Sequence, residues 1–518
     1  MAKKIVGILV VLLLLAVPLG SVYAYEALRG LTGVLQWDEA NAYNGYTLFT
    51  AMEETKSYLI DMEGWIVHDW QTDSRPGLHD RLLENGNLLR GFRPTVDYNG
   101  DPVGSGVAIG GQGGGVQEFT WDGNLIWEYI NKTDVSVQHH TFYRMPNENT
   151  LIELWEKIEC VDAVAAGRDP ATCVDADGLW PDMIEEVDHT VLPGRPQVVW
   201  QWRVWDHIVQ DVDAGLPTFG DPAANPDKLD LNFWVKVPWG FKDWNHGNNV
   251  EYNANTDQMI LCSRNWGEFY VIDKATGGII FRWGNPGAYD SVTYELPSFN
   301  DDGDQDLFGP HSVVFLGSHD PTNAGTPGNI LIFDNGWNRP RGNRSRTVEL
   351  EPNYANWPAS PRVWSWQAQD ANSFYTAFQG GTQRLPNGNT FNTSTEGGHL
   401  VEVTAGGDVV WEFVLPSGDG EGNRLLFTDD RVTRTIHRAH RYGPDYPGFA
   451  GQESYLERSR ATLTHIRGVS TPIWAGWDDP DVVADYTEPD ALTGWGFEVI
   501  GIGGGGSAGG AAGGDSGY

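Results

Sequence analysis

The segment that decides the fold is Gly380–Phe413, GGTQRLPNGNTFNTSTEGGHLVEVTAGGDVVWEF. It reads as four short β-prone runs, separated by an Asn-Gly turn at Asn387-Gly388 and by two Gly-Gly pairs. Asn-Gly between β-prone runs is the strongest short-range signal for a hairpin, because both turn residues tolerate positive φ. Four antiparallel strands of this size form one blade of a β-propeller.

The second half of this unit, two strands joined by a polar turn and ending in aromatic residues, recurs along the chain. Its six copies are Tyr58–Trp70, Glu118–Tyr129, Met183–Trp202, Tyr270–Gly284, Thr347–Trp366 and Leu400–Phe413. The first copy, preceded by Tyr46–Thr50, forms an incomplete unit. Repeats of this kind predict an all-β fold, a six-bladed β-propeller. Their irregular spacing indicates long inserted loops, which cost little closure entropy. Many of the 23 Trp fall at the ends of the fourth strands, where a flat ring covers the seam between blades.

The N-terminus has the pattern of a secretory signal peptide over residues 1–24. Lys3 and Lys4 precede the apolar run Ile5–Gly20, and a small-residue cleavage site ends at Ala24. We therefore expect a periplasmic or extracellular protein with no membrane contact after cleavage, an uncleaved anchor being the alternative. We assign residues 25–450 to the propeller and residues 451–518 to a C-terminal extension with a disordered Gly-rich tail.

The charge balance limits the partners. The chain has 70 acidic and 34 basic residues, a formal net charge of −36. Such a balance argues against nucleic acid as a partner. It also makes clustered basic residues informative, and the basic run Val432–Tyr442 is the densest, although the sequence assigns it no role. The sequence does not indicate an oligomeric state.

The three cysteines divide into two classes. Cys160 and Cys173 lie in one polar insertion, and export permits a disulfide between them. The spacing leaves open whether that bond forms. Cys262 lies in an apolar run and is expected to be a buried core thiol.

Histidine and arginine mark one face of the predicted ring. In a propeller blade, the start of the inner strand and the loop between strands two and three lie on the same face. Four units begin their inner strand with histidine, and three such loops carry a basic residue: His79, His140, His246 and His311, then Arg264, Arg339 and His399. In so acidic a chain, this convergence predicts an anion-binding site. Any single histidine of this kind is as well explained by a hydrogen bond to a neighbouring blade.

A metal site is the other interpretation of clustered histidines, since imidazole is the commonest metal ligand. No carboxylate accompanies these histidines in a short motif, and arginine is a poor neighbour for a cation. The loop Asn300–Asp306, NDDGDQD, resembles a calcium loop but lacks its distal Glu, so a solvated loop is expected. We expect neither a metal nor a cofactor.

Several motifs together resemble the bacterial arylsulfate sulfotransferases, which use a phenolic sulfate as donor. The resemblance covers about Ala51 to Gly451 and is carried by KDWNHGNN, FGPHSVVF, FDNGWNR and GGHLVEV. It implies an exported six-bladed propeller that transfers a sulfuryl group by a ping-pong mechanism through a sulfated histidine. By this resemblance, His399 is the nucleophile, and His246, His311 and Arg339 complete the catalytic set.

The chemistry of such a transfer assigns the remaining site residues. Sulfuryl transfer develops charge on peripheral oxygens, which fixed cationic donors stabilise. We expect His140 and Arg264 to bind substrate and Trp244 to stack on an aryl ring. The partners would be an aryl sulfate donor and a phenolic acceptor. A non-catalytic exported propeller that binds an anion or scaffolds a surface complex is the alternative, and a quinone-dependent dehydrogenase a weaker third.

Overall fold

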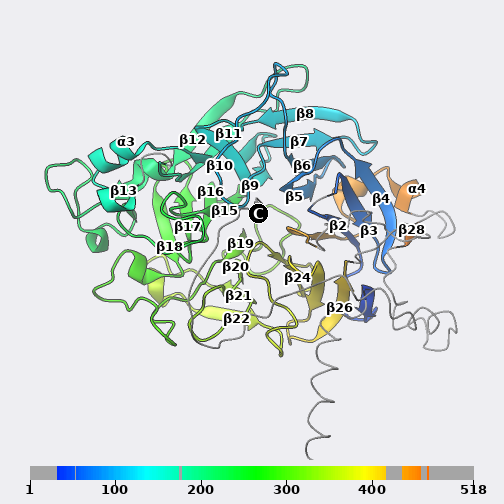
Figure 1. The fold of residues 1–518 in the computed structure, drawn as a ribbon. Helices are drawn as coiled ribbons and strands as arrows, with labels where there is room; N and C mark the ends of the chain where they lie inside the picture. The colour runs from blue at the N-terminus through cyan, green and yellow to red at the C-terminus, as the bar shows by residue number, and fades with distance from the viewer. Residues whose placement is uncertain (1–31, 53, 174–177, 416–434, 457–463, 466–518) are drawn as a thin grey trace, which may run out of the picture.

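The computed structural model describes residues 32–52, 54–173, 178–415, 435–456 and 464–465. Six sheets are arranged around a central axis, which confirms the predicted all-β, six-bladed propeller (Figure 1). Two short α-helices are described, α3 (Cys160–Ala165) and α4 (Glu453–Leu456). Among the described residues, no helix combines the length and the hydropathy needed to cross a membrane. The signal-peptide expectation, and nearly all of the C-terminal extension, lie outside the described residues.

Blades two to six each take four consecutive strands, ordered from the axis outward. Blade two holds β5 (Pro76–Leu82), β6 (Leu88–Phe92), β7 (Gly115–Phe119) and β8 (Leu125–Ile130). Blade three holds β9 (Ser136–Arg144), β10 (Thr150–Glu156), β11 (Asp182–Val187) and β12 (Val198–Arg203). Blade four holds β15 (Gly247–Asn253), β16 (Gln258–Ser263), β17 (Glu268–Asp273) and β18 (Ile279–Trp283). Blade five holds β19 (His311–Phe315), β20 (Ile330–Asp334), β21 (Arg346–Leu350) and β22 (Arg362–Trp366). Blade six holds β23 (Gly381–Arg384), β24 (Thr390–Ser394), β25 (His399–Val403) and β26 (Val409–Val414).

Both ends of the described chain close the ring. Blade one consists of β2 (Tyr46–Thr50), β3 (Lys56–Ile60) and β4 (Trp65–Gln71), with β27 (His440–Tyr442) as its innermost strand. A short strand, β28 (Thr464–His465), pairs with β4 on the outside. The N-terminal β1 (Gly33–Trp37) pairs with β26 as a fifth strand of blade six. The first unit is thus incomplete as predicted, and the basic run that the sequence left without a role supplies its inner strand. Closure removes free sheet edges, which otherwise invite pairing with other chains.

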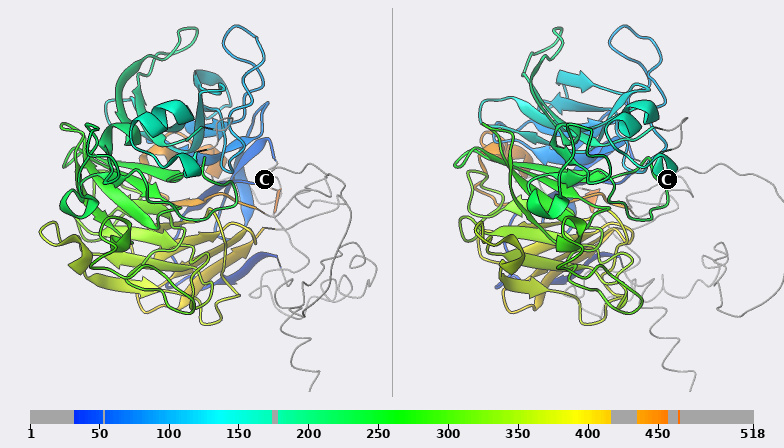
Figure 2. Two further views of the ribbon diagram at one scale, coloured as in Figure 1. Left: turned by 60° about the vertical axis from the view of Figure 1, so that its left-hand side comes forward. Right: turned by 90° about the vertical axis from the view of Figure 1, so that its left-hand side faces the viewer.

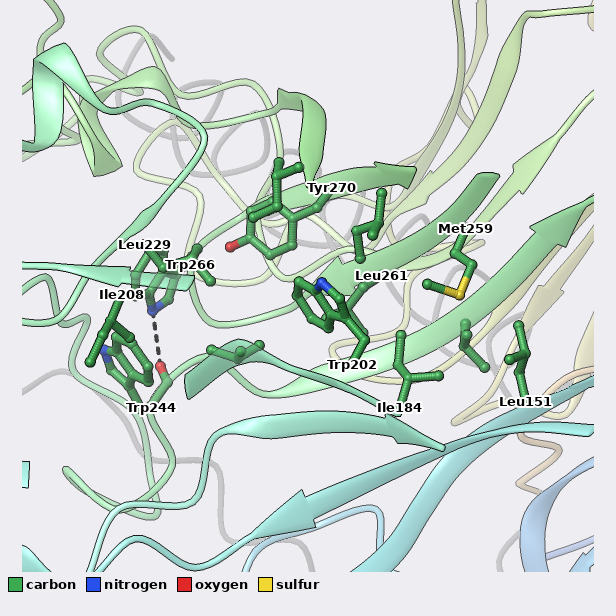
Figure 3. Close-up of a cluster of buried hydrophobic side chains, with 14 of the residues drawn as sticks. Leu151, Ile184, Trp202, Ile208, Leu229, Trp244, Met259, Leu261, Trp266 and Tyr270 are labelled. Atoms are coloured by element: carbon green, nitrogen blue, oxygen red, sulfur yellow. Dashed lines mark hydrogen bonds between the residues drawn. The ribbon is translucent and has the colours of Figure 1, made fainter. Parts of the chain in front are cut away.

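Tryptophans of the fourth strands join neighbouring blades. In five of the six seams, an indole Nε1 donates to a carbonyl in the hairpin turn of the next blade, at 2.8–3.3 Å: Trp70 to Thr120, Trp127 to Asp188, Trp202 to Gly277, Trp366 to Gly407 and Trp411 to Met62. This confirms the expected use of tryptophan at the seams. Figure 3 shows the seam between blades three and four, where Trp202 packs with Leu261 and Ile184.

The inserted loops lie outside the ring of inner strands. Cys160, at the start of α3, forms a disulfide with Cys173, the bond that the sequence had left open. A two-stranded parallel pair, β13 (Ile208–Val209) with β14 (Leu229–Asp230), lies in the insertion before blade four. The side views in Figure 2 bring these insertions to the front of the ring. Cys262 is a buried free thiol, as predicted.

The inner ladders of blades two to five share an irregularity in register. The register shifts at Pro76/Asp80, Ile152/Leu154, Gly247/Val250 and His311/Val313. Left-handed residues stand at the same places: Leu78 (φ 99°), His140 (φ 40°), His246 (φ 52°) and Ser312 (φ 55°). Bulges and strained backbone of this kind occur beside active sites, where they redirect side chains.

Candidate functional site

Six histidines gather at the axis and form what we call the axial histidine cluster: His79, His140, His246, His311, His437 and His440. The ring of His140 lies 5.1 Å from that of His246, 6.2 Å from His311 and 6.4 Å from His437, between centroids. His79 lies 5.3 Å from His440 and 6.2 Å from His437. All six are nearly inaccessible to solvent. The structure therefore brings together the four histidines predicted to head the inner strands.

The C-terminal segment adds cluster members that sequence reasoning missed. His437, Arg438 and His440 stand in or just before β27, the inner strand of blade one. Two sequence signals pointed to them: the first unit lacked an inner strand, and the basic run followed the last repeat. In a closed ring, the segment after the last repeat can supply the inner strand that the first unit lacks, and β27 does so.

His311 has a defined tautomer. Its Nδ1 lies 2.8 Å from Asn335 Oδ1 and 3.1 Å from the carbonyl of Gly309. Asn335 donates from Nδ2 to the carbonyls of Thr376 and Gln379, so its Oδ1 must accept. Nδ1 of His311 therefore carries the proton, and Nε2 keeps a free lone pair. Burial, together with the nearby Arg264 charge, holds the pKa of His311 well below its ordinary value, so the ring is neutral.

His246 is paired with a carboxylate. Its Nδ1 lies 2.8 Å from Asp243 Oδ1, and both side chains are buried. The ring stacks on Trp239, 5.6 Å away at 11°, and lies 5.4 Å from Trp155. A carboxylate on Nδ1 fixes the orientation of the ring, which suits an acid–base group.

Two arginines reach the cluster without a carboxylate partner among the described residues. The Arg264 guanidinium lies 4.6 Å from the Trp337 ring and 5.9 Å from Trp239, and Nη1 donates to Asn265 Oδ1. Arg438 donates to Asn249 Oδ1 and, from Nε, to the Gly380 carbonyl. Burial lowers the pKa of Arg438 to about 10, so it stays charged at neutral pH.

Glycine at position 381 makes room for the second of these arginines. A Cβ built on Gly381 would lie 2.6 Å from Cγ of Arg438. Blade six thus presents no side chain at the head of its inner strand, and the Arg438 side chain takes that space.

Several nitrogens of the cluster have no hydrogen-bond partner within the described part of the chain. They are His79 Nδ1, Arg438 Nη2 and both ring nitrogens of His437 and His440. Buried polar atoms without partners are destabilising, at about 1–3 kcal/mol each. Their concentration at one place, beside two arginines, is what a site for an anionic ligand requires.

Arg339 lies elsewhere, in a structural ion-pair network. It forms salt bridges with Asp302 at 3.1 Å and with Asp334 at 2.6 Å. Asp334 also pairs with Arg346 at 2.9 Å. The guanidinium is thus committed to carboxylates, one of them in the acidic loop 300–306, and within the described residues it forms no hydrogen bond with His246 or His311.

His399 is also apart from the cluster. It begins β25, the third strand of blade six, two strands out from the inner β23. Two strand spacings amount to about 10 Å. Its Nε2 lies 2.7 Å from Glu412 Oε1, and its ring is 5.2 Å from Phe374. Strand order within the blade therefore separates His399 from the inner strands, a separation that the short motif does not encode.

Trp244 belongs to the hydrophobic core and not to the site mouth. It is fully buried, donates from Nε1 to the Phe233 carbonyl at 2.9 Å, and accepts at its own carbonyl from Trp266 (Figure 3). The aromatic rings that do flank the cluster are those of Trp239 and Trp337, both partly exposed.

Comparisons with known proteins give one informative match. A profile described as Arylsulfotransferase (ASST) matches residues 34–405. No curated protein matches. Solved structures resemble the chain only distantly. One is a Bacteroides caccae protein of unknown function, with a TM-score of 0.41, 13% identity, and 76% of this chain and 98% of that chain covered. Another is the Cps50 (Swd1) β-propeller domain of Myceliophteria thermophila, with a TM-score of 0.36, 12% identity and coverages of 74% and 89%. We draw no argument from likenesses at this level.

The profile match spans the strands from β1 to β25, and thus all six blades. It covers well over half of the chain and includes four members of the axial histidine cluster. The chain belongs to the arylsulfotransferase family.

Proposed function

We propose that this protein transfers a sulfuryl group from an aryl sulfate to an acceptor phenol, and that the axial histidine cluster is its active site. The observation that carries the proposal is the neutral His311, oriented through Nδ1 by Asn335, beside Arg264, which has no carboxylate partner within the described part of the chain. An oriented, neutral imidazole is a nucleophile, and a fixed cation stabilises the charge that sulfuryl oxygens develop.

In the first half-reaction, Arg264 and Arg438 bind the sulfate oxygens. Nε2 of His311 attacks sulfur, an N–S bond forms, and the bond from sulfur to the aryl oxygen breaks. The pKa of a phenol is about 10, so a proton on the departing oxygen assists the step. His246, held by Asp243, supplies that proton.

In the second half-reaction, the acceptor phenol gives its proton to His246 and attacks the sulfur of the N-sulfo group. The N–S bond breaks, and its electron pair returns to His311. Each substrate thus reacts with the same imidazole in turn, which is a ping-pong sequence. Trp239 and Trp337, partly exposed on either side of Arg264, offer faces on which an aryl ring can stack.

The assignment of His311 as nucleophile in place of His399 is tested by two matched variants. We expect H311Q to lose at least about 10³-fold in release of 4-nitrophenol from 4-nitrophenyl sulfate with phenol as acceptor. We expect H399Q to keep wild-type turnover. Quenched wild-type protein should carry the mass of one sulfuryl group on the peptide that contains His311. Loss of activity in H399Q with retention in H311Q would restore the assignment made from sequence.

A second candidate function is anion binding without chemistry. The unpartnered nitrogens of His437, His440 and Arg438 favour it, because they bind an anion whether or not transfer follows. Wild-type protein that binds aryl sulfate in calorimetry, yet releases no phenol with any acceptor, would identify this function.

We further propose that the protein is exported. The proposal rests on the sequence of residues 1–24, in which Lys3 and Lys4 precede an apolar run. Fractionation of cells that express the full chain, with N-terminal sequencing of the product, tests both export and cleavage after Ala24.

A further inference from the structure

Three buried ligand atoms converge in blade three, next to the axial histidine cluster. His139, Glu153 and Asp182 each offer one ligand atom, and these atoms lie within 4.8 Å of one another. The side chains come from β9, β10 and β11, which are adjacent strands of the sheet. All three residues are fully buried at 0% exposure. His139 Nε2 lies 3.2 Å from Asp182 Oδ1.

Apart from this approach of His139 to Asp182, His139 Nε2, Glu153 Oε1 and Asp182 Oδ1 have no hydrogen-bond partner that meets geometric criteria within the described residues. The other polar atom of each side chain is held. Glu153 Oε2 accepts from Thr141 Oγ1 at 3.0 Å. Asp182 Oδ2 accepts from the Gly247 amide at 2.5 Å and from Asn245. His139 Nδ1 lies 3.0 Å from His140 Nδ1. The far atoms are thus fixed by the protein, and the remaining ligand atoms lie close together.

The charge of this group is not compensated by a described ion pair with arginine or lysine. Two buried carboxyls side by side repel when ionised, and burial of an unpaired charge costs several kcal/mol. Apolar residues would fill the same volume without that cost, and a bound cation would offset it. We propose that His139, Glu153 and Asp182 bind one divalent first-row transition-metal ion, Zn²⁺ foremost.

The geometry and the donor types fit this ion. Ligands bound at 2.0–2.1 Å to a tetrahedral Zn²⁺ lie about 3.3 Å apart, which agrees with the 3.2 Å between His139 Nε2 and Asp182 Oδ1. Two carboxylates balance a charge of about +2, and an imidazole favours zinc over calcium, which takes six to eight oxygens. Water would complete the coordination.

Two neighbours shape the site. A Cβ on Gly247 would lie 2.6 Å from Glu153 Oε1 and 2.6 Å from Asp182 Cγ, so glycine is what lets the two carboxyls approach. Trp155 stacks on the His139 ring at 3.8 Å and 15°, which fixes the plane of the imidazole. Support of this kind for the ligating side chains is typical of metal sites.

The ion would also set the tautomer of a cluster histidine. Metal on His139 Nε2 leaves the proton on its Nδ1, which then donates to His140 Nδ1. His140 in turn carries its own proton on Nε2 and becomes a hydrogen-bond donor in the cluster, near His246 and His311. The inference does not rest on the proposed function, because it is read from coordination alone.

The experiment measures metal in the full chain after purification, chelation and reloading with Zn²⁺ or Ca²⁺. We expect about one Zn²⁺ per wild-type chain and no retained Ca²⁺. We expect E153Q and D182N to keep less than about a tenth of that zinc, since each loses a charged ligand. The matched control is E251Q, which changes another buried carboxyl, on β15. E251Q should retain the metal.

X-ray absorption of the zinc-loaded wild type tests the ligand set without any variant. We expect a first shell of nitrogen and oxygen only, with a single imidazole. Four outcomes would each overturn the proposal. Two concern the zinc content: equal zinc in wild type and in E153Q or D182N, or no zinc in reloaded wild type. Two concern the ligands: a sulfur ligand or a second imidazole. Thermal melting establishes that the variants are folded, and added Zn²⁺ should raise the melting temperature of wild type and of E251Q alone.

Discussion

Arg438 donates from Nη1 to Asn249 Oδ1 at 2.8 Å, so a hydrogen bond joins the inner strand of blade four to the segment that completes blade one. These blades stand opposite each other in the ring. The guanidinium therefore lies at the axis, between the histidines, and connects the closing strand of the chain to the far side of the propeller.

We predict that R438Q loses turnover with little loss of folding. The guanidinium is the cation held at the axis, and removal of one such donor costs about 10²–10³ in kcat. The effect should appear in kcat with aryl sulfate and in the affinity for inorganic sulfate. R341Q is the matched control, because Arg341 forms an exposed surface pair with Asp301. Unchanged turnover in R438Q would remove Arg438 from the site.

For the acid–base pair, we predict that D243N slows turnover according to the leaving group. Asp243 orients the ring of His246, the proposed proton donor, and proton donation matters most when the departing phenol is a weak acid. D243N should therefore lower turnover of phenyl sulfate by about 10²-fold and that of 4-nitrophenyl sulfate by much less. Equal losses for both donors would mean that Asp243 does not act through proton donation by His246.

Arg339 should matter for stability and not for chemistry. R339Q removes the buried cation from Asp302 and leaves Asp334 with Arg346 alone, and the loss of one member of a buried ion pair costs about 3–5 kcal/mol. We expect a lower denaturation midpoint, with kcat of the folded protein close to wild type. A fall in kcat without a fall in stability would return Arg339 to the catalytic set.

The seam tryptophans should stabilise ring closure. Trp411 is fully buried and donates to the Met62 carbonyl at 2.9 Å, which joins blade six to blade one. W411F removes that bond and part of the packing, for an expected loss of about 2 kcal/mol in the free energy of unfolding. W364F, at a half-buried position in blade five, should cost less. The opposite order in urea denaturation would contradict the role of the seam.

His440 should make stability depend on pH. Burial, with Arg81 and Arg438 nearby, holds its pKa well below the ordinary value, so the native state keeps this ring neutral. The unfolded chain takes up a proton near pH 6.5, so stability present above that pH is lost as the pH falls. Between pH 6.5 and 5.5, wild type should lose about 1 kcal/mol more than H440Q. If the urea midpoints of wild type and H440Q fall by the same amount between pH 6.5 and 5.5, the proposed effect of His440 on stability is wrong.

The sequence predicted the blades because their signals are local. Turn chemistry such as Asn387-Gly388 and the aromatic fourth strands each act within about ten residues. Inner-strand position then placed His140, His246 and His311 together, since strand order determines distance from the axis.

The rest of the site depended on contacts that no short segment encodes. His399 and Arg339 stood in familiar motifs, but Glu412, the partner of His399, comes from the adjacent strand, and Asp302, one partner of Arg339, comes from a loop 37 positions earlier. Arg438 becomes a site residue only because β27 pairs with β2, nearly 400 positions earlier in the chain. The approach of Glu153 and Asp182 to His139 could likewise not be predicted, because these residues lie on neighbouring strands and not in a shared motif.

The late position of Arg438 has a consequence for biosynthesis. A nascent chain that has emerged as far as blade six already holds His311 and Arg264, yet it lacks the axial guanidinium and the inner strand of its first blade. Translation must therefore reach the final segment before the cluster is complete, and a polypeptide truncated before it would be inert however well its blades had formed.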